Sequence, residues 1–294
     1  MIVNADDFGY TTGVNRAIFE AHTQGIVTSS TLMANGPAFA DAVRMANAMP
    51  RLSIGCHVVL IDGEPLLAPN RIPTLTRTEA RRTKFRDGLV SFAARAIAGS
   101  IAADEIEAEA TAQIRKLQSA LQSAGITVSH FDTHKHTHIF PRVLKPLLRA
   151  GSACGVKAVR NPFGPRRPLR SSELMAKPGL WKRTAEVRIL RAFARKFRES
   201  VDRQGFGTPD GTLGIEVTGA LDERLFRAIA ETIPEGTWEF VCHPGYNDAD
   251  LQAANTRLRA SRELELKALT LPEARRLLAD RDIELISYRE LGSH

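Results

Sequence analysis

The sequence lacks several features that would place the protein in a specialised class. Its three cysteines are far apart and odd in number (Cys56, Cys154, Cys242), so a disulfide framework is not expected. No apolar run approaches the roughly 20 residues that are needed to cross a bilayer. No basic and apolar leader of the secretory type precedes the first acidic residues. We therefore expect a protein that is made and kept in the cytoplasm.

The overall composition is ordinary, but the charge is unevenly distributed. The chain has 294 residues, of which 43% are hydrophobic and 25% charged, and it shows no repeat. Of its net charge of +7, residues 157–203 hold fourteen Lys/Arg against four Asp/Glu, so the rest is slightly acidic. Such a segment is either a solvated helical face or a contact with an anionic membrane or nucleic acid. We predict one domain over residues 1–294, with a basic Pro/Gly/Arg-rich and helical insert at about 161–205.

Strand-like and helix-like segments alternate along the whole chain. Beyond the N-terminal strand, strands are predicted near residues 26–33, 52–60, 126–132, 156–160, 214–218, 237–242 and 284–288. Helices are predicted near residues 12–22, 37–49, 79–98, 104–123, 141–150, 181–200, 221–232, 257–269 and 272–280. This alternation is typical of an α/β fold with a mainly parallel sheet. About seven strands favour a (β/α) barrel, irregular or with a strand missing. A doubly wound parallel sheet is the alternative.

Two adjacent carboxylates end the first predicted strand. The run Met1-Ile2-Val3-Asn4-Ala5 leads directly into Asp6 and Asp7, and Gly9 indicates a turn. Two acids at the end of a buried strand repel each other unless they share a cation or a proton. The alternative is a solvated turn after an edge strand.

Other reactive side chains also follow predicted strands. They are His57, Asp132, His134 and His243. Because ligands of parallel α/β folds bind beyond the carboxyl ends of the strands, we expect these side chains to gather near the Asp pair. Cys56 and Cys242 precede two of the histidines, so they face the other way and are predicted to be buried hydrophobes.

A cluster of histidines follows Asp132. Four of the eight histidines fall within residues 130–138, and imidazole with carboxylate suits zinc and other divalent ions. Spacing does not decide between the histidines: alternate residues share a face in an extended chain, whereas His134 and His138 share one in a helix. His243, held before Pro244-Gly245, is either a proton donor or a buried hydrogen-bonded histidine.

Four motifs, in this order, resemble those of the YdjC/ChbG-like carbohydrate deacetylases. They are Asn4-Ala5-Asp6-Asp7-Phe8-Gly9, Gly55-Cys56-His57, Asp132-Thr133-His134-Lys135-His136-Thr137-His138 and Cys242-His243-Pro244-Gly245. The resemblance runs from residue 1 to about 290. It implies a metal-dependent hydrolase on a barrel-like fold that removes acetyl groups from N-acetylated amino sugars. Thr133 stands where many members have Ser, which keeps the hydroxyl.

The resemblance also implies roles for individual residues. Asp7, His57 and His134 would hold one divalent metal ion, with Asp6 as general base and His243 as general acid. The two histidines favour Zn²⁺ over Mg²⁺ on ligand chemistry. Four further residues are expected around this centre: His136, His138 and Arg160 to orient substrate or second-shell groups, and Asp132 to hold a histidine tautomer.

A narrower resemblance suggests the substrate. The basic insert, the stretch Thr208–Gly214 and the stretch Cys242–Asp248 are similar to the hopanoid-biosynthesis-associated HpnK subgroup. That subgroup implies deacetylation of an N-acetylglucosaminyl hopanoid. A lipid-linked sugar would bring the protein to the inner face of the cytoplasmic membrane. Helix 181–200, with Phe193 and Phe197 on one side and arginines around them, could lie in that interface, and no nucleic acid is expected.

Three alternatives stay open at this point. The first is a deacetylase of soluble chito-oligosaccharides. The second is another metal-dependent hydrolase such as a phosphoesterase, for which more metals and more carboxylates are expected than this chain offers near its histidines. The third is a nucleic-acid or membrane binding protein whose function lies in the basic insert.

Overall fold

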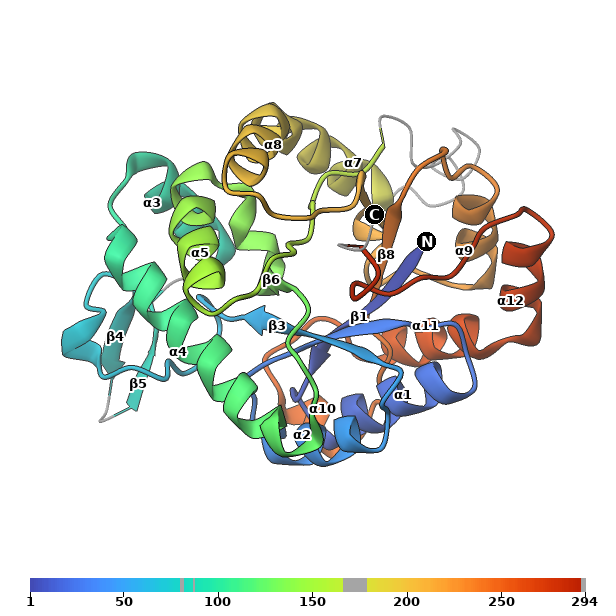
Figure 1. Cartoon of the computed structure of the whole chain (residues 1–294), viewed down its shortest axis with the longest axis horizontal. Helices are drawn as coiled ribbons and strands as arrows, with labels where there is room; N and C mark the ends of the chain where they lie inside the picture. The colour runs from blue at the N-terminus through green and yellow to red at the C-terminus, as the bar shows by residue number, and fades with distance from the viewer. Residues whose placement is uncertain (80–81, 87, 166–178, 292–294) are drawn as a thin grey trace.

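A parallel sheet forms the centre of the molecule, and helices surround it (Figure 1). The computed structural model describes residues 1–79, 82–86, 88–165 and 179–291. Within these ranges the main sheet has six parallel strands in the order β6-β3-β2-β1-β8-β7. The strands are β1 (Ile2–Phe8), β2 (Ser29–Leu32), β3 (Ser53–Val58), β6 (Phe131–Thr133), β7 (Gly211–Leu213) and β8 (Trp238–Cys242).

The two edge strands of this sheet are linked by short irregular pairings. Phe131 of β6 pairs with Val159, and Ala158 pairs with Gly207, shortly before β7. The segment around residue 158 therefore bridges the two edges of the curled sheet. Strands β1, β2, β3 and β6 lie side by side in chain order, the chain then crosses to β7 at the other edge, and β8 returns to pair with β1. The predicted barrel-like α/β fold with an irregular strand is confirmed, as a curled half-barrel.

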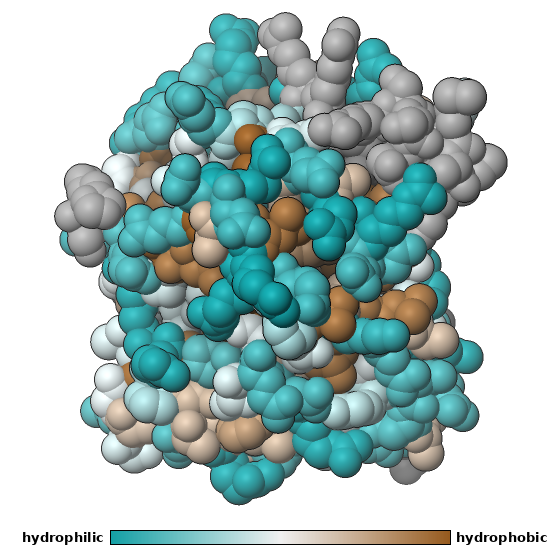
Figure 2. Space-filling model, turned by 90° about the vertical axis from the view of Figure 1, so that its right-hand side faces the viewer, coloured by the Kyte–Doolittle hydropathy of each residue, from teal (hydrophilic) through white to brown (hydrophobic). Residues whose placement is uncertain are grey.

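Helices cover the outside of the half-barrel. The first half of the chain supplies α1 (Thr12–Thr23), α2 (Phe39–Asn47), α3 (Leu89–Ala98), α4 (Ala103–Leu121) and α5 (Pro141–Ala153). The later part of the chain adds α7 (Gly179–Leu190), α8 (Ala194–Arg203), α9 (Glu223–Ala230), α10 (Ala249–Ala253), α11 (Ala260–Thr270) and α12 (Pro272–Ala279). The side near α9 and α12 is largely hydrophilic, with apolar surface near its centre (Figure 2). None of the helices in the described ranges is long and apolar enough to span a membrane.

Strand β1 lies in the interior, between β2 and β8, and every one of its residues is buried. A parallel strand covered on both faces is expected to be nearly continuously apolar, and Val3, Ala5 and Phe8 do belong to the main hydrophobic core. The polar residues of this strand, Asn4, Asp6 and Asp7, are therefore buried as well. They need internal partners, because an unpaired buried polar group costs several kcal/mol, on the order of 2–7.

The helix predicted over residues 79–98 is partly wrong. Its first part is a separate antiparallel hairpin of β4 (Thr76–Glu79) and β5 (Arg82–Phe85), and only Leu89–Ala98 is helical. The Thr78 and Thr83 hydroxyls lie 3.2 Å apart across the hairpin. Such cross-strand threonine pairs stabilise a hairpin, whereas the many arginines around them resemble a charged helical face in the sequence.

Three other predicted elements also differ from the structure. The strand at 214–218 is replaced by β7 and a 3-10 helix at Ile215–Val217, because Gly214 at φ +94° turns the chain. The strand at 284–288 is reduced to one bridge between Ile286 and Ile2. Helix 181–200 is divided into α7 and α8 by a 3-10 turn at Arg191–Phe193. Within the predicted insert at 161–205, residues 166–178 lie outside the described residues.

The packing at Gly55 predicts a stability effect. A Cβ atom at this position would lie 2.5 Å from the ring of His130, and His130 is stacked on Tyr288 with ring centroids 3.6 Å apart. We expect Gly55→Ala to lower the free energy of unfolding by about 1–3 kcal/mol because neither ring has room to move. Gly88→Ala is the control, since nothing lies within 4 Å of its Cβ. Urea unfolding curves measure both, and equal midpoints for the two variants would contradict the packing argument.

Candidate active site

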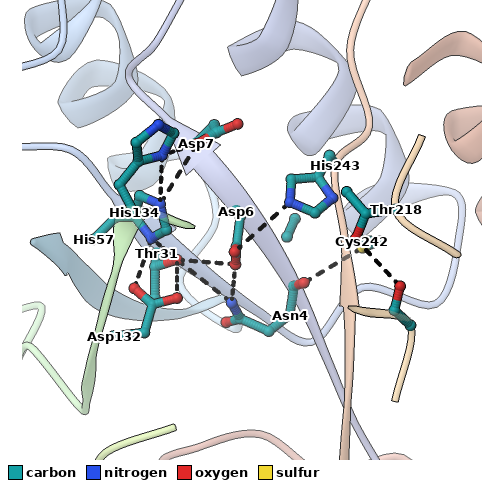
Figure 3. Close-up of polar contacts among 12 residues, drawn as sticks. Asn4, Asp6, Asp7, Thr31, His57, Asp132, His134, Thr218, Cys242 and His243 are labelled. Atoms are coloured by element: carbon teal, nitrogen blue, oxygen red, sulfur yellow. Dashed lines mark hydrogen bonds and ion pairs between the residues drawn. The ribbon is translucent and has the colours of Figure 1, made fainter. Parts of the chain in front are cut away.

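All six reactive side chains that were expected at strand ends lie together in the structure (Figure 3). They come from four strands or from the residue that directly follows one: Asp6 and Asp7 (β1), His57 (β3), Asp132 and His134 (β6), His243 (β8). The sheet therefore brings segments that are far apart in sequence to one edge, as the parallel topology predicts.

The two aspartates are separated by an irregularity in β1. The pairing of β1 with β2 shifts between Ala5 and Phe8, and Asp7 has a left-handed backbone at φ 67°. Aspartate tolerates this conformation better than most residues, but it still costs on the order of 1–3 kcal/mol. As a result the two carboxylates do not share partners. Asp6 faces Arg160, and Asp7 faces His57, His134 and Arg262.

Three donor atoms on one side of the site could hold a metal ion. Asp7 Oδ1 lies 3.5 Å from His57 Nε2 and 3.3 Å from His134 Nδ1. The two histidine nitrogens are 3.3 Å apart. Ligands around a tetrahedral zinc ion, with bonds of about 2.1 Å, are separated by about 3.4 Å. The donor atoms and their spacing therefore fit a catalytic metal site with three protein ligands.

His57 is oriented by Asp132. Its Nδ1 lies 2.6 Å from Asp132 Oδ1 and 3.1 Å from the Thr31 hydroxyl, and all three side chains are buried. A proton on Nδ1 that is donated to Asp132 leaves Nε2 for a metal. Burial opposes the charged ring, but Asp132 outweighs this and raises the pKa of His57 to about 9. Without a cation the ring carries a second proton near neutral pH, and a metal would replace it.

The three alternate histidines after Asp132 point to different places. They lie in a short 3-10 helix, His134–Ile139, in which Lys135 and His136 both have a left-handed φ of 54°. The chain is therefore neither an extended strand nor a regular helix, and neither simple rule for shared faces applies. His134 joins Asp7 and His57, whereas His138 and His136 do not.

His138 is fully buried, which argues against contact with substrate. Its Nδ1 is 2.7 Å from the Thr133 hydroxyl, and its ring faces Phe197 at 6.3 Å between centroids. Burial, assisted by the charge of Arg160, lowers the pKa of His138 to about 3, so its ring is neutral. Burial therefore favours the second of the two roles predicted for His138, the orientation of second-shell groups, and this role stays a prediction. His136 is half-buried, 6.2 Å from the His138 ring.

Arg160 is likewise inaccessible to substrate. It is fully buried and contacts carboxylates from three strands. Two nitrogens donate to Asp6 at 2.8 and 2.6 Å, Nη1 lies 2.5 Å from Asp132 Oδ2, and Nε and Nη2 donate to Glu239 at 2.9 and 2.6 Å. Of the two roles predicted for Arg160, these contacts favour the orientation of second-shell groups over the orientation of substrate, because its guanidinium is occupied by these three side chains.

Asp6 is an ionised carboxylate with one less crowded oxygen. Burial opposes its ionisation, but the charge and hydrogen bonds of Arg160 hold the pKa well below its usual range. Oδ1 accepts from Asn4, Thr31 and Arg160, whereas Oδ2 accepts only from Arg160 Nη1 among the described residues. Oδ2 also lies 3.9 Å from His243 Nε2 (Figure 3). A proton can therefore be accepted at Oδ2, on the side of His243.

Two residues of α11 complete the site, and the sequence analysis missed both. Arg262 Nη2 lies 2.5 Å from Asp7 Oδ2, and Glu265 accepts the backbone N–H of His243 at 2.6 Å. Both are buried. The sequence did contain a signal, because Arg262 and Glu265 lie on the same side of α11 as the buried Leu266 and Leu269. Charged residues on an apolar stripe indicate buried partners.

Fold and site together define an α/β half-barrel with an Asp-His-His group, two members buried and His134 half-buried, at the carboxyl ends of its strands. The chain belongs to the YdjC-like protein family, whose model matches residues 1–280. Similar proteins include the carbohydrate deacetylase of Brevibacillus brevis, 31% identical over 99% of both chains. The carbohydrate deacetylase of Geobacillus stearothermophilus is 33% identical over 98% of this chain and 96% of its own.

Solved structures support the same fold. A protein of Enterococcus faecalis named for cellobiose-phosphate cleavage superposes with a TM-score of 0.75 at 25% identity, over 99% of this chain and 97% of its own. A lactam utilization protein of Thermus thermophilus gives a TM-score of 0.52 at 16% identity, over 98% of this chain and 100% of its own. The second likeness concerns the fold alone.

The buried network around Arg160 predicts a large stability effect. Arg160→Met would leave three buried carboxylates without their counter-charge, so we expect a loss of about 3–5 kcal/mol in the free energy of unfolding. Adding Glu239→Gln should restore part of it, because one buried charge is then removed. The control is Arg276→Met on the surface, whose ion pair with Glu273 at 2.9 Å should contribute less than about 1 kcal/mol. Equal losses for Arg160→Met and Arg276→Met, measured by urea unfolding, would contradict the network.

Proposed function

We propose that the protein is a metal-dependent N-deacetylase that releases acetate from an N-acetylated amino sugar. The main observation is the division of the site into an Asp-His-His donor group and a separate ionised Asp6 facing His243. Metal-dependent amide hydrolysis needs both a site for the ion and independent groups to move protons. Membership of the YdjC-like family and relatives named carbohydrate deacetylases support this assignment.

One divalent ion is proposed at Asp7 Oδ1, His57 Nε2 and His134 Nδ1. Donor separations of 3.3–3.5 Å are nearer to the tetrahedral value of about 3.4 Å than to the roughly 3.0 Å of an octahedral magnesium site. The two imidazoles and the spacing favour Zn²⁺ over Mg²⁺. When bound, such an ion polarises a carbonyl oxygen and lowers the pKa of a ligated water.

Asp6 is proposed as the general base. The water that attacks the acetyl carbonyl carbon must lose a proton, and Asp6 Oδ2 has a lone pair that no second donor occupies among the described residues. Arg160 keeps this carboxylate charged and fixes its orientation by two hydrogen bonds. Arg160 is therefore proposed as a positioning residue for Asp6.

His243 is proposed as the general acid. The bond between the carbonyl carbon and the sugar nitrogen breaks only if the nitrogen is protonated, because an amide anion is too poor a leaving group. His243 Nε2 lies 3.9 Å from Asp6 Oδ2, so the acid and the base lie next to each other. Glu265 holds the backbone of His243, and its carboxylate lies 3.7 Å from His243 Nδ1. The products are acetate and the free amine of the sugar.

The proposed substrate is an N-acetylglucosaminyl hopanoid, which is converted to the glucosaminyl hopanoid. His136, half-buried beside the site, is retained as a proposed substrate contact. A lipid-linked sugar requires contact with a membrane surface, proposed here as the inner face of the cytoplasmic membrane. Exposed apolar side chains on α7 support such contact: Trp181 is 58% and Ile189 75% exposed, with the exposed Arg188 between them in the sequence.

The apolar contact that the sequence analysis assigned to Phe193 and Phe197 does not hold. Phe193 packs against Phe140 with ring centroids 5.9 Å apart, and Phe197 is buried against Phe163 at 5.7 Å. These rings stabilise the attachment of α8 to the body of the protein. The proposed membrane contact therefore depends on α7.

Substitutions of the two aspartates of β1 should have different effects on metal content and on acetate release. Asp6→Asn should leave metal content unchanged and lower acetate release from N-acetylglucosamine oligomers or lipids by about 10²–10⁴-fold, because a proton acceptor is lost. Asp7→Asn should lower metal content itself, because a charged ligand is lost. Metal is measured by emission spectrometry of the purified protein, with Asp202→Asn on the exposed face of α8 as control. Loss of metal in Asp6→Asn together with retention in Asp7→Asn would reverse the assignment.

The lipid-linked substrate and the membrane contact can be tested separately. We expect acetate from an N-acetylglucosaminyl lipid and several-fold less from soluble chito-oligosaccharides; acetate from the soluble sugar alone would exclude the hopanoid. Anionic vesicles should sediment the protein at low salt and less at high salt. Replacing Trp181 and Ile189 by Ser should reduce this binding. Leu264→Ser on α11, where Leu264 is 53% exposed, is the matched control and should leave it unchanged.

A further inference from the structure

Helix α11 contributes a cation directly to the metal-ligand Asp7. The guanidinium of Arg262 is 1% exposed, and its Nη2 lies 2.5 Å from Asp7 Oδ2. The other carboxylate oxygen, Oδ1, is the one near His57 Nε2 and His134 Nδ1. The two oxygens of Asp7 therefore have different partners: Oδ2 belongs to Arg262, and Oδ1 faces the two imidazoles.

Arg262 is itself held in place on two sides. Its Nε donates to the carbonyl of Leu258 at 3.1 Å, one turn earlier. Its aliphatic part packs against Gly245, where an added Cβ would lie 2.8 Å from Arg262 Cδ and 3.2 Å from its Cβ. Gly245 also donates its backbone N–H to the carbonyl of Arg262 at 3.3 Å. The turn after His243 thus leaves room for this side chain, which contacts Leu258 and Gly245 in addition to Asp7.

We propose that Arg262 is a positioning residue that limits Asp7 to one oxygen in metal coordination. A carboxylate can bind a cation through one oxygen or both. A second oxygen would fill a coordination position that a catalytic site must leave open for water and substrate. The strand pairing does not limit Asp7 to one oxygen, because its left-handed backbone removes it from the regular pairing of β1 with β2. The proposal rests on the metal site of the proposed function.

The charge of Arg262 predicts the direction in which metal affinity changes when this residue is replaced. A guanidinium beside a metal ion repels it, so a residue that served only to strengthen metal binding would not carry this charge. Removing Arg262 frees Asp7 Oδ2 and removes the repulsion. The metal should then bind at least as tightly as before, while turnover falls because the open position is filled. A purely structural role predicts the opposite, namely weaker binding of the metal.

The experiment compares Arg262→Met and Arg262→Lys with the wild-type protein. All three are loaded with Co²⁺, whose visible absorption weakens as its coordination number rises, and metal affinity is measured by competition with a chelator. We expect Arg262→Met to show weaker absorption, unchanged or tighter metal binding, and a kcat lower by about 10–100-fold with little change in KM. Arg262→Lys keeps the charge with a single donor group and should be intermediate. Arg259→Met, an exposed arginine three residues earlier, should behave as wild type.

The outcomes separate this inference from the function on which it rests. An unchanged cobalt spectrum in both Arg262 variants would overturn the proposal, and a raised KM would then indicate direct contact with substrate. Weaker metal binding in Arg262→Met would also overturn it, in favour of a structural role; if this variant does not fold, the Arg262→Lys spectrum decides. If the wild type binds Co²⁺ and releases no acetate, the proposed function fails while the spectral result for Arg262 still stands. A wild type that binds no metal overturns both.

Discussion

The site depends on the burial of one guanidinium among three carboxylates. Arg160 joins Asp6 of β1, Asp132 of β6 and Glu239 of β8, and all four side chains are buried. Burial alone would favour the neutral acids, as the raised pKa of Glu239 illustrates. Arg160 reverses this for Asp6, whose pKa is held low. Because Asp132 in turn orients His57, one cation sets both the charge of the proposed base and the direction of a proposed ligand.

A second cation, Arg262, lies on the other side of the irregularity in β1. Adjacent residues of one strand thereby pair with two different arginines, Asp6 with Arg160 and Asp7 with Arg262. The left-handed backbone of Asp7 is the physical cause of this separation. It allows two neighbouring carboxylates to remain ionised in a buried place, which two acids sharing one environment could not do. The strain in the backbone of Asp7 is thus offset by the charge pairs of Asp6 with Arg160 and of Asp7 with Arg262.

Much of the site was predictable because parallel strands deliver their carboxyl ends to one edge. That rule located Asp6, His57, Asp132 and His243 from sequence alone. The rule fails where the direction of a side chain depends on irregular backbone. The left-handed conformations of Lys135 and His136 are such a case, and the direction of the histidines in this segment does not follow from their spacing. Spacing left open whether Arg160 orients substrate or second-shell groups, because sequence does not reveal how many carboxylates converge on one cation. The hairpin of β4 and β5 was missed because its charged residues resemble an exposed helical face.

The stacking of His130 on Tyr288 has a consequence for the order of assembly. Tyr288 also donates its hydroxyl to Glu239 at 2.6 Å, and Ile286 pairs with Ile2, so a late segment of the chain completes the polar cluster beneath β1. Strand β1 leaves the ribosome early, yet its neighbour β8 and this tyrosine emerge more than two hundred residues later. Contacts of such long separation slow folding. The pair of Asp7 with Arg262 therefore forms only when nearly the whole chain has been synthesised, whereas Arg160, the partner of Asp6, emerges near the middle.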